Sequence, residues 1–547
     1  MIQSFPQLLI APVVLPLVTA ALLLLLGEKR RHAKSIVNIG GALLGLLVAL
    51  LIVRSANAGT VGVYLMSNWE APFGIVLVAD RFSALMLVLV GVVSLCAALY
   101  AEAAWARAGA YFHALFQIQL MGLNGAFLTG DLFNLFVFFE VMLAASYGLH
   151  LHGSGWPRVR SGLHYIAVNL LASSLFLVGI AVLYGVMGTL SMADIAEKLT
   201  LVPAGDRGLL HAGAAILAVA FLIKAAIWPL NSWLVPAYTA TSAPVAALFA
   251  LMTKVGIYVL VRLWTLFFSA GPSAQFGGTV LLYAGLLTLA FGAIGVMASL
   301  SLGRIAGFSV LVSSGTLLAA LGTGTPAMLA AALFYMLSAT LAVSALFLLV
   351  ELVKRMGSNG QRWALAADLG PGEDTNLDDE EAPLVGRAFP VSMALLGLAF
   401  MACALLVAGL PPLSGFVAKL SLLTALLSPA DPHASTSSAI PFAAWLFFGL
   451  LLLSGLSATI SLSRAGIRHF WSTGGRHPPR LKGVEAASVF GLLFSCLALT
   501  LGAEPVLRAT SATALGLHAP KAYIAAVLSM KPRPGPTRSV VEKETTP

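Results

Sequence analysis

Long apolar runs separated by short polar loops are the feature that most constrains how this chain can fold. A helix needs about 20 mostly apolar residues to cross a bilayer, and about fourteen runs of the 547-residue sequence meet that need. Hydrophobic residues make up 59% of the chain and charged residues 10%, whereas soluble domains carry about 25% charged residues. The sequence therefore predicts an all-α polytopic membrane protein with about 14 transmembrane helices. It excludes a soluble globular protein, a disordered chain and a nucleic-acid-binding protein.

The predicted spans follow one another, with mostly short loops between them, along most of the chain. They lie near residues 7–26, 36–56, 81–101, 109–129, 131–151, 163–188, 209–238, 243–268, 278–298, 304–322, 326–353, 390–428, 440–463 and 486–503. The first is expected to be a span and not a signal peptide, because no basic segment precedes it and no small-residue cleavage pattern follows it. The runs 209–238 and 390–428 are too long for one straight span, and both contain proline.

Lysine and arginine in the loops predict the orientation, because basic loops stay on the cytoplasmic side. With the N-terminus outside, inner loops hold 17 of the 31 basic residues, mainly within 29–34, 354–387 and 464–482. The net charge of +9 is therefore a topology signal more than a sign of an anionic ligand. Both termini are expected on the outer side, which is periplasmic in a bacterial inner membrane.

Two segments are too polar to lie in the membrane. The inner linker 356–389 holds seven Asp and Glu residues. It is expected to be a solvated connection, and a docking strip for a partner is the alternative. The tail from about residue 531 is polar and rich in proline, which is typical of disorder.

Four ionisable side chains are predicted deep in the membrane, namely Glu140, Lys224, Lys254 and Lys419. A charge at the bilayer centre costs about 2.5–3.5 kcal/mol on insertion scales, so such residues are functional candidates. Glu140 lies nine residues after Asp131, about 13.5 Å along a helix. A purely structural ion pair is the alternative for Glu140, and Asp131 is expected at the membrane boundary, as a proton-access or relay-supporting residue.

Prolines are expected to break two of the helices that carry these lysines. Pro229 follows Lys224 by five residues, and Pro411 and Pro412 precede Lys419. Proline removes a backbone donor and clashes with the preceding turn. A broken helix at membrane depth is tolerated only where it faces protein or a wet cavity. A lysine beside such a break is therefore a stronger functional signal than either feature alone.

The two breaks also predict an internal repeat, since paired interrupted helices mark repeated transporter folds. Pro229 and Pro411 are 182 positions apart. We expect two inverted five-helix repeats, each with one proline-broken helix. The predicted division is residues 1–101 for three N-terminal helices, 107–268 for the first half, 278–463 for the second half, and 486–547 for a last helix and polar tail.

This set of charges suits a proton relay better than a metal-ion path. Desolvation favours a neutral lysine and a nearby glutamate favours the charged form, so moving one partner switches the proton. Hard cations prefer several oxygen ligands, whereas this interior offers one deep carboxylate and three lysines. Lys254 is expected to face the bundle interior. Arg262 lies closer to the outer end, where it could snorkel to the surface, and a structural role is expected for it. Any Na⁺ or K⁺ route is expected in another subunit or at an interface.

No cofactor or metal motif stands out in the sequence. Dinucleotide fingerprints, phosphate-binding loops and CxxC pairs are missing, and the histidines lack metal-ligand spacing. The three cysteines lie far apart within apolar runs, which indicates packing and no disulfide framework.

The chain resembles the D subunits of multi-subunit Mrp-type (Mnh, Pha) cation/proton antiporters, relatives of the antiporter-like subunits of respiratory complex I. The resemblance spans about residues 5–505. It is carried by the stretch 68–81, by Phe139-Glu140, by Lys224 with Ala-Ala-Ile-Trp-Pro229, by Lys254, and by Gly409-Leu-Pro-Pro-Leu-Ser-Gly415. Together these motifs are specific, although each alone is weak.

The resemblance implies roles and partners. Glu140 and Lys224 would form the coupling pair, Lys254 the bridging lysine and Lys419 the terminal lysine. The family implies fourteen helices and a hetero-oligomer of six or seven different subunits in the bilayer. Such complexes exchange protons for Na⁺ or K⁺, so the chain would be a secondary transporter subunit and not an enzyme.

One departure from the family concerns the predicted helix 326–353, where relatives often carry histidine or lysine. Here Tyr335 is its only ionisable group before Glu351, with Ser338 nearby. Hydroxyls and water must carry protons there, or the relay is shorter. The main alternative is a proton-pumping subunit of a quinone-reducing or hydrogenase-type complex. A scaffold with vestigial charges and a stand-alone transporter are the others.

Overall fold

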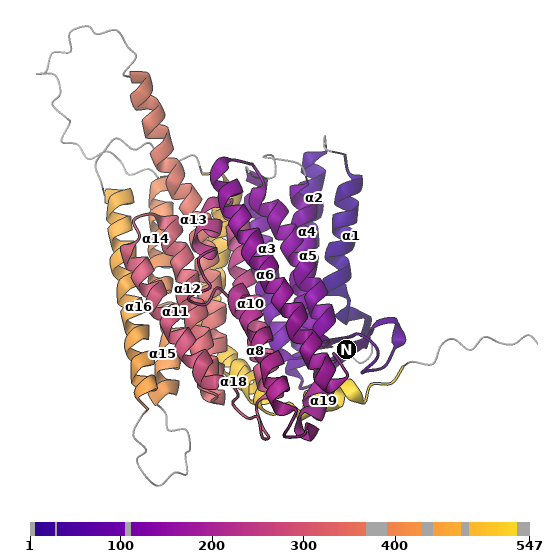
Figure 1. The fold of residues 1–547 in the computed structure, drawn as a ribbon. Coiled ribbons are helices and arrows are strands. Elements are labelled where there is room, and N and C mark those ends of the chain that lie inside the picture. The colour runs from indigo at the N-terminus through magenta and orange to yellow at the C-terminus, as the bar shows by residue number, and fades with distance from the viewer. Residues whose placement is uncertain are drawn as a thin grey trace, which may run out of the picture.

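The computed structural model is a bundle of long, roughly parallel and antiparallel helices (Figure 1). It describes residues 6–27, 30–103, 105, 111–367, 391–427, 441–471 and 481–532. Among these residues, twelve helices are long and apolar enough to cross a membrane, judged by length and composition. The predicted class, an all-α multi-pass membrane protein, is confirmed. The end of the bundle where the first helix begins is called the outer end, after the predicted orientation.

The N-terminal part holds three long helices and a small hairpin. In chain order it contains η1 (Pro6–Leu9), α1 (Ala11–Leu25), α2 (Arg31–Asn57), β1 (Gly62–Leu65), η2 (Met66–Asn68), β2 (Val76–Ala79) and α3 (Arg81–Ala103).

The next part contains the first broken helix. It comprises α4 (Phe112–Leu128), α5 (Leu132–Leu151), α6 (Trp156–Met187), α7 (Met192–Lys198), η4 (Leu199–Leu201), α8 (Arg207–Lys224), α9 (Leu234–Ala240) and α10 (Ala243–Phe267). The predicted run 209–238 is therefore two helices, α8 and α9, with an irregular segment between them.

The remaining part contains the second broken helix. It comprises α11 (Gly278–Ala298), α12 (Leu302–Gly322), α13 (Pro326–Ala367), α14 (Val391–Ala408), α15 (Ser414–Leu427), α16 (Phe442–Gly466), a π-helical turn η5 (Ile467–Trp471), α17 (Gly483–Leu501), α18 (Ala503–His518) and α19 (Lys521–Leu528). Each predicted apolar run contains a helix. The total of fourteen spans and the inverted repeat stay predictions.

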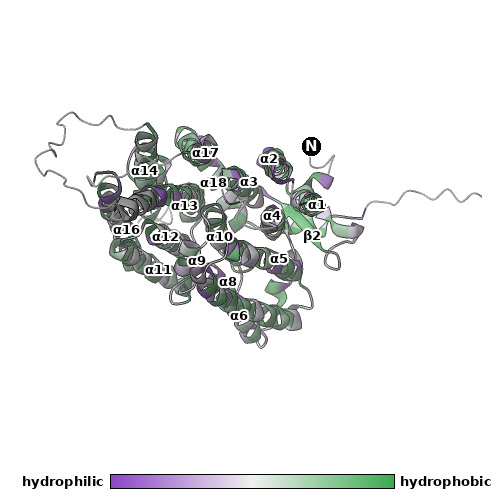
Figure 2. Ribbon diagram, turned by 90° about the horizontal axis from the view of Figure 1, so that it is seen from above, coloured by the Kyte–Doolittle hydropathy of each residue, from purple (hydrophilic) through white to green (hydrophobic). Residues whose placement is uncertain are grey.

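Helix α10 lies in the middle of the bundle, as the view along the helices shows (Figure 2). It packs against α3, α4, α8, α12 and α13. All of its residues, including Lys254 and Arg262, are buried. A helix without a lipid-facing side can hold polar side chains only if other helices supply their partners.

Three features of the termini and loops were not predicted from the sequence. The first is the connection between α2 and α3, an antiparallel hairpin in which Gly62 pairs with Ala79 and Leu65 with Val76. The free edge of β2 is covered, because Gly130 N–H donates to Val76 O over 2.9 Å. Strands this short, with a covered edge, give little of the alternating polar and apolar pattern by which a strand is recognised in a sequence.

The second feature is a pair of helices, α18 and α19, which follow the last predicted span 486–503 and precede the predicted polar tail. Helix α18 buries Thr510, Thr513, Ala514 and Leu517, which lie on one face, and it packs against α13. Such an amphipathic helix is too polar to register as a span. In Figure 1, α18 and α19 run across the outer end of the bundle, from α13 toward the N-terminal hairpin, which α19 contacts through β1.

The third feature is that α13 continues to Ala367, so the predicted linker 356–389 begins as helix. The next proline is Pro371, so no helix breaker interrupts this segment earlier. The acidic residues 368–389 and the tail 533–547 lie outside the described residues.

Glycines allow α11 and α12 to pack at unusually short range. A Cβ atom at Gly285 would lie 2.3 Å from the backbone nitrogen of Ala319, and one at Gly322 would lie 2.3 Å from Leu282 N. Close backbone approach through small residues is a common way to join helices in membranes.

We expect Gly285→Ala to destabilise the chain by at least about 1–3 kcal/mol, because the added methyl forces two backbones apart. The thermal midpoint of the detergent-solubilised protein, followed by size-exclusion chromatography, checks this. Gly449→Ala in α16 is the matched control, since no atom lies within 4 Å of the position of its Cβ. Equal midpoints for both variants would contradict the close-packing argument.

Candidate functional site

Lys224 is the last residue of α8, so it lies directly at the helix break. The sequence placed the break five residues later, at Pro229. Proline clashes with the carbonyl of residue i−4, here Ala225, so the chain leaves the helix before the proline. Ala226 has a φ of 55°, which turns the backbone sharply. The Ile223 carbonyl, which accepts the backbone N–H of Ala226 over 3.0 Å, also accepts the indole N–H of Trp233 over 3.2 Å.

Ser173 of α6 connects Glu140 and Lys224. Its hydroxyl donates to Glu140 Oε1, and Lys224 Nζ donates to Ser173 Oγ over 3.3 Å. Lys224 Nζ also lies 5.0 Å from the centre of the Phe139 ring. The described residues contain no direct ion pair between Glu140 and Lys224. The structure thus brings the two predicted residues together, with a hydroxyl between them that sequence reasoning missed.

Lys254 is buried, and its partner is a hydroxyl on α12. Its Nζ donates to Ser313 Oγ over 2.9 Å. The hydroxyl of Tyr335 lies beside Ser313 and Thr316. Lys254 therefore faces the bundle interior, as the sequence predicted. Within the described residues no hydrogen bond joins Lys254 to Lys224, although α10 touches the break, since a Cβ at Gly256 would lie 3.0 Å from Ala225 N.

Hydroxyl groups continue from Tyr335 toward the second break. Tyr335 and Ser338 line a small cavity together with Ser309 and Ser454. The hydroxyls of Ser338 and Ser414 lie 2.9 Å apart. A cavity with several polar groups can hold bridging water.

Lys419 lies just beyond the second break, which separates α14 from α15. Gly409 has a φ of 77°, and Pro411 and Pro412 follow it. Lys419 is buried, and its Nζ donates to the carbonyl of Ala408, the last residue of α14, over 2.8 Å. The lysine thus satisfies a carbonyl that the break leaves without its helical partner.

Asp131 is the N-cap of α5. Its carboxylate accepts the backbone N–H of Asn134 over 2.8 Å. Burial raises the pKa of Asp131, and the N–H groups of Asn134 and Phe133 oppose this increase. The cap gives the residue a structural role at the start of the helix that carries Glu140, and its position at the membrane boundary stays a prediction.

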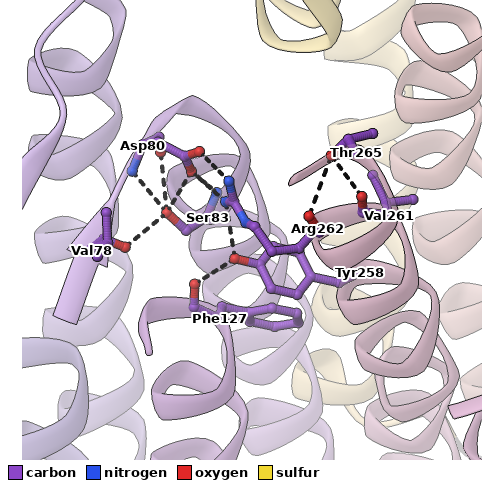
Figure 3. A network of polar contacts seen from close by, with 8 residues as sticks. All are labelled: Val78, Asp80, Ser83, Phe127, Tyr258, Val261, Arg262 and Thr265. Carbon is purple, nitrogen blue, oxygen red and sulfur yellow. Dashed lines mark hydrogen bonds and ion pairs between the residues drawn. The ribbon is translucent and has the colours of Figure 1, made fainter. Parts of the chain in front are cut away.

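Arg262, for which the sequence left snorkelling open, does not reach the surface. It is buried and forms a bidentate ion pair with Asp80, with N–O distances of 2.5 and 2.7 Å (Figure 3). Tyr258 accepts a further bond from Arg262 over 3.2 Å and donates to Phe127 O over 2.7 Å. An arginine on a fully enclosed helix cannot reach water, so it needs a carboxylate nearby. Asp80, at the start of α3, is the partner that the sequence alone did not pair.

A second ionic network lies at the inner end. Arg355 of α13 contacts Glu351, and its Nη1 lies 2.5 Å from Glu485 Oε1 of α17. Trp105 Nε1 donates to Glu351 Oε2 over 2.7 Å. The network ties α13 and α17 to the connection after α3.

Residues 129–436, which include both breaks and the four deep charges, match the family described as NADH:quinone oxidoreductase/Mrp antiporter, transmembrane. The chain belongs to this family. The resemblance seen in the sequence is thereby confirmed, and both helix breaks lie within the residues that match the family.

Relatives in this family match nearly the whole chain. The D subunit of a probable K⁺/H⁺ antiporter from Rhizobium meliloti is 52% identical over 97% of this chain and 98% of its own. The D subunit of a Na⁺/H⁺ antiporter from Alkalihalophilus pseudofirmus is 32% identical over 95% of this chain and 99% of its own. A chain of the Mrp complex from Dietzia sp. DQ12-45-1b has a TM-score of 0.78 at 29% identity and covers 95% of this chain and 99% of its own.

The ion pair at the outer end predicts an acid-sensitive step in stability. Burial raises the pKa of Asp80, but the Arg262 guanidinium and the Ser83 hydrogen bonds more than offset this and hold the pKa below its usual value. The stabilisation is therefore present above about pH 4 and is lost as the pH falls through the folded-state pKa. Asp80→Asn should destabilise the protein at neutral pH by about 3–5 kcal/mol, because Arg262 loses its buried partner.

The thermal midpoint in detergent, measured between neutral and acidic pH, checks both parts of this prediction. The parent should lose more stability on acidification than Asp80→Asn does, because the variant has already lost the pair. An identical acid-induced drop in the two proteins would show that Asp80 is not the sensitive group.

Proposed function

We propose that this chain is the proton-translocating D-type subunit of a multi-subunit monovalent cation/proton antiporter in a bacterial inner membrane. The observation that carries the proposal is the Glu140–Ser173–Lys224 contact at the first helix break. It lies within a chain that is 52% identical to the D subunit of a probable K⁺/H⁺ antiporter. Buried ionisable groups joined by hydroxyls and water are the elements from which membrane proton relays are built.

The relay begins with the exchange of a proton between Glu140 and Lys224 through the Ser173 hydroxyl. Ser173 both accepts a hydrogen bond from the amine and donates one to the carboxylate, so a proton can move by rearrangement of two existing bonds. A charged lysine is favoured when the carboxylate is ionised and disfavoured when the carboxyl is protonated. The pair therefore couples the two protonation states.

Lys254 is the bridging lysine of the proposed relay. Ser313, Tyr335 and the cavity lined by Tyr335, Ser338 and Ser454 then lead toward the second break. Ser338 contacts Ser414, which begins the helix that carries Lys419. In this proposal the hydroxyl groups on and beside α13 carry the proton where related chains often have a histidine or lysine.

The transported cation is K⁺ or Na⁺, and the more similar relative favours K⁺. The interior described above is rich in lysine, which repels cations, so the cation route belongs to partner subunits or their interface. Both termini lie on the periplasmic side in this arrangement, and basic loops lie in the cytoplasm. A redox-linked proton pump remains the alternative function.

Glu140→Gln should abolish cation-induced collapse of the pH gradient in everted vesicles that contain the complete complex. The substitution keeps the shape of the side chain but cannot hold the negative charge that the relay needs. Fluorescence of a pH-gradient dye after addition of K⁺, and then Na⁺, measures the response. An undiminished response with normal assembly would reject the relay. A parent complex that responds to neither cation would favour the redox-linked pump.

Ser173→Ala should slow exchange by about three- to tenfold, because a single hydrogen bond contributes about 0.5–1.5 kcal/mol. Ser174→Ala is the matched control. Its hydroxyl is exposed and bonds only to the Leu170 carbonyl over 3.1 Å. Initial rates of gradient collapse in the same vesicles separate the two variants, and equal rates would remove Ser173 from the proton route.

A further inference from the structure

Five side chains form a closed cluster at the outer end of the bundle, here called the outer node: Asp80, Ser83, Tyr258, Arg262 and Tyr523. They come from the start of α3, from α10 and from the C-terminal helix α19. Figure 3 shows four of these side chains and their bonds between α3, α10 and the end of α4. None of the five belongs to the proton route proposed above.

The node holds Arg262 in one orientation. Two parallel hydrogen bonds to Asp80 define the plane of the guanidinium. The rings of Phe82, Tyr258 and Tyr523 lie 5.4, 5.5 and 5.3 Å from its central carbon. Ser83 in turn holds Asp80, since its backbone N–H donates to Asp80 Oδ1 over 2.9 Å. Neither charge can change its position without the loss of several bonds at once.

The node also reaches the helices on either side of the α4–α5 connection. Tyr258 donates to Phe127 O in the last turn of α4. Two residues later, Thr129 accepts a bond from Asn134 in the first turn of α5, over 2.9 Å. Asp131 caps the same turn. Two sets of hydrogen bonds, linked by the backbone of residues 127–129, therefore join the outer end of α10 to the start of α5.

These two helices carry the relay residues at similar distances from these bonds. Lys254 lies eight residues from Arg262 on α10, or about 12 Å along the helix. Glu140 lies nine residues from Asp131 on α5, or about 13.5 Å. We propose that the outer node is a positioning device that fixes the height of Lys254 relative to Glu140 in the membrane. This inference rests on the proposed proton route.

Small displacements matter at the lysine. The bond between Lys254 and Ser313 is 2.9 Å long, and at a separation of about 3.6 Å the two groups no longer form a hydrogen bond. One residue of helix rise is about 1.5 Å. A partial shift of α10 along its axis is therefore enough to separate Lys254 from its partner, while the lipid-facing helices stay in place.

Tyr258→Phe is the mildest test, because it keeps the ring and removes only the hydroxyl bonds. Asp80→Asn is the stronger test. We expect a three- to tenfold lower maximal rate of gradient collapse in everted vesicles, with an unchanged cation concentration for half-maximal response, since the cation route is elsewhere. Tyr184→Phe, on the exposed side of α6, and Asp194→Asn, which removes the outer-end pair with Lys198, are the matched controls.

A double-mutant cycle separates positioning from general weakening of the fold. If the node acts by aligning Lys254 with Ser313, Tyr258→Phe combined with Ser313→Ala should be no slower than the slower single variant. Effects that multiply would overturn the inference. Assembly of each variant is checked by co-purification of the complex, and Tyr258→Phe decides the outcome where Asp80→Asn fails to assemble.

Lys254→Met separates the failure of this inference from failure of the proposed function. Full exchange in Lys254→Met would remove Lys254 from the route and reject the proposed relay itself. Loss of exchange in Lys254→Met with parental rates in Tyr258→Phe and Asp80→Asn would reject the positioning role alone.

Discussion

The lack of hydrogen-bond partners in hydrocarbon is the constraint on which the rest of this structure depends. Every polar group at membrane depth must be satisfied by the protein or by trapped water. Helices satisfy the backbone, and the enclosed helix α10 places its two charged side chains among neighbours that can bond them. Lys254 bonds Ser313, and Arg262 bonds Asp80. At the two helix breaks, where Trp228 and Leu410 are themselves exposed, the buried side chains of Trp233 and Lys419 donate to backbone carbonyls at the helix ends.

The polar groups are arranged in three levels that differ in chemistry. Full ion pairs lie toward the ends, with Asp80–Arg262 at the outer end and Glu351–Arg355–Glu485 at the inner end. The middle level uses lysines bonded to hydroxyls or carbonyls, without a direct ion pair among the described residues. A carboxylate close to a basic side chain stabilises its protonated form, so a strong ion pair opposes loss of the proton. A neutral hydroxyl partner opposes loss of the lysine proton less. Rigid ends and an exchangeable middle are therefore complementary parts of one design.

Much of the fold follows from the sequence because apolar length, loop charge and proline act locally. The helices, the two breaks and the interior position of Lys254 were predicted on that basis. The position of Lys224 at its break was missed by five residues, because a proline disrupts the turn before it. The partner of Arg262 was missed because Asp80 is 182 positions away. Ser173 was missed since one serine among many on an apolar helix has no distinguishing pattern, and its role depends on which helix packs against it.

The two helix breaks differ in what holds their ends. At the first, a neutral indole completes the hydrogen bonding of Ile223, and indole does not change its charge in the physiological range. At the second, the ammonium group of Lys419 does the same for Ala408. An uncharged amine is a weaker donor than an ammonium. The first break is therefore a fixed element of the architecture, while the end of α14 is held by a bond whose strength follows the occupancy of a single proton.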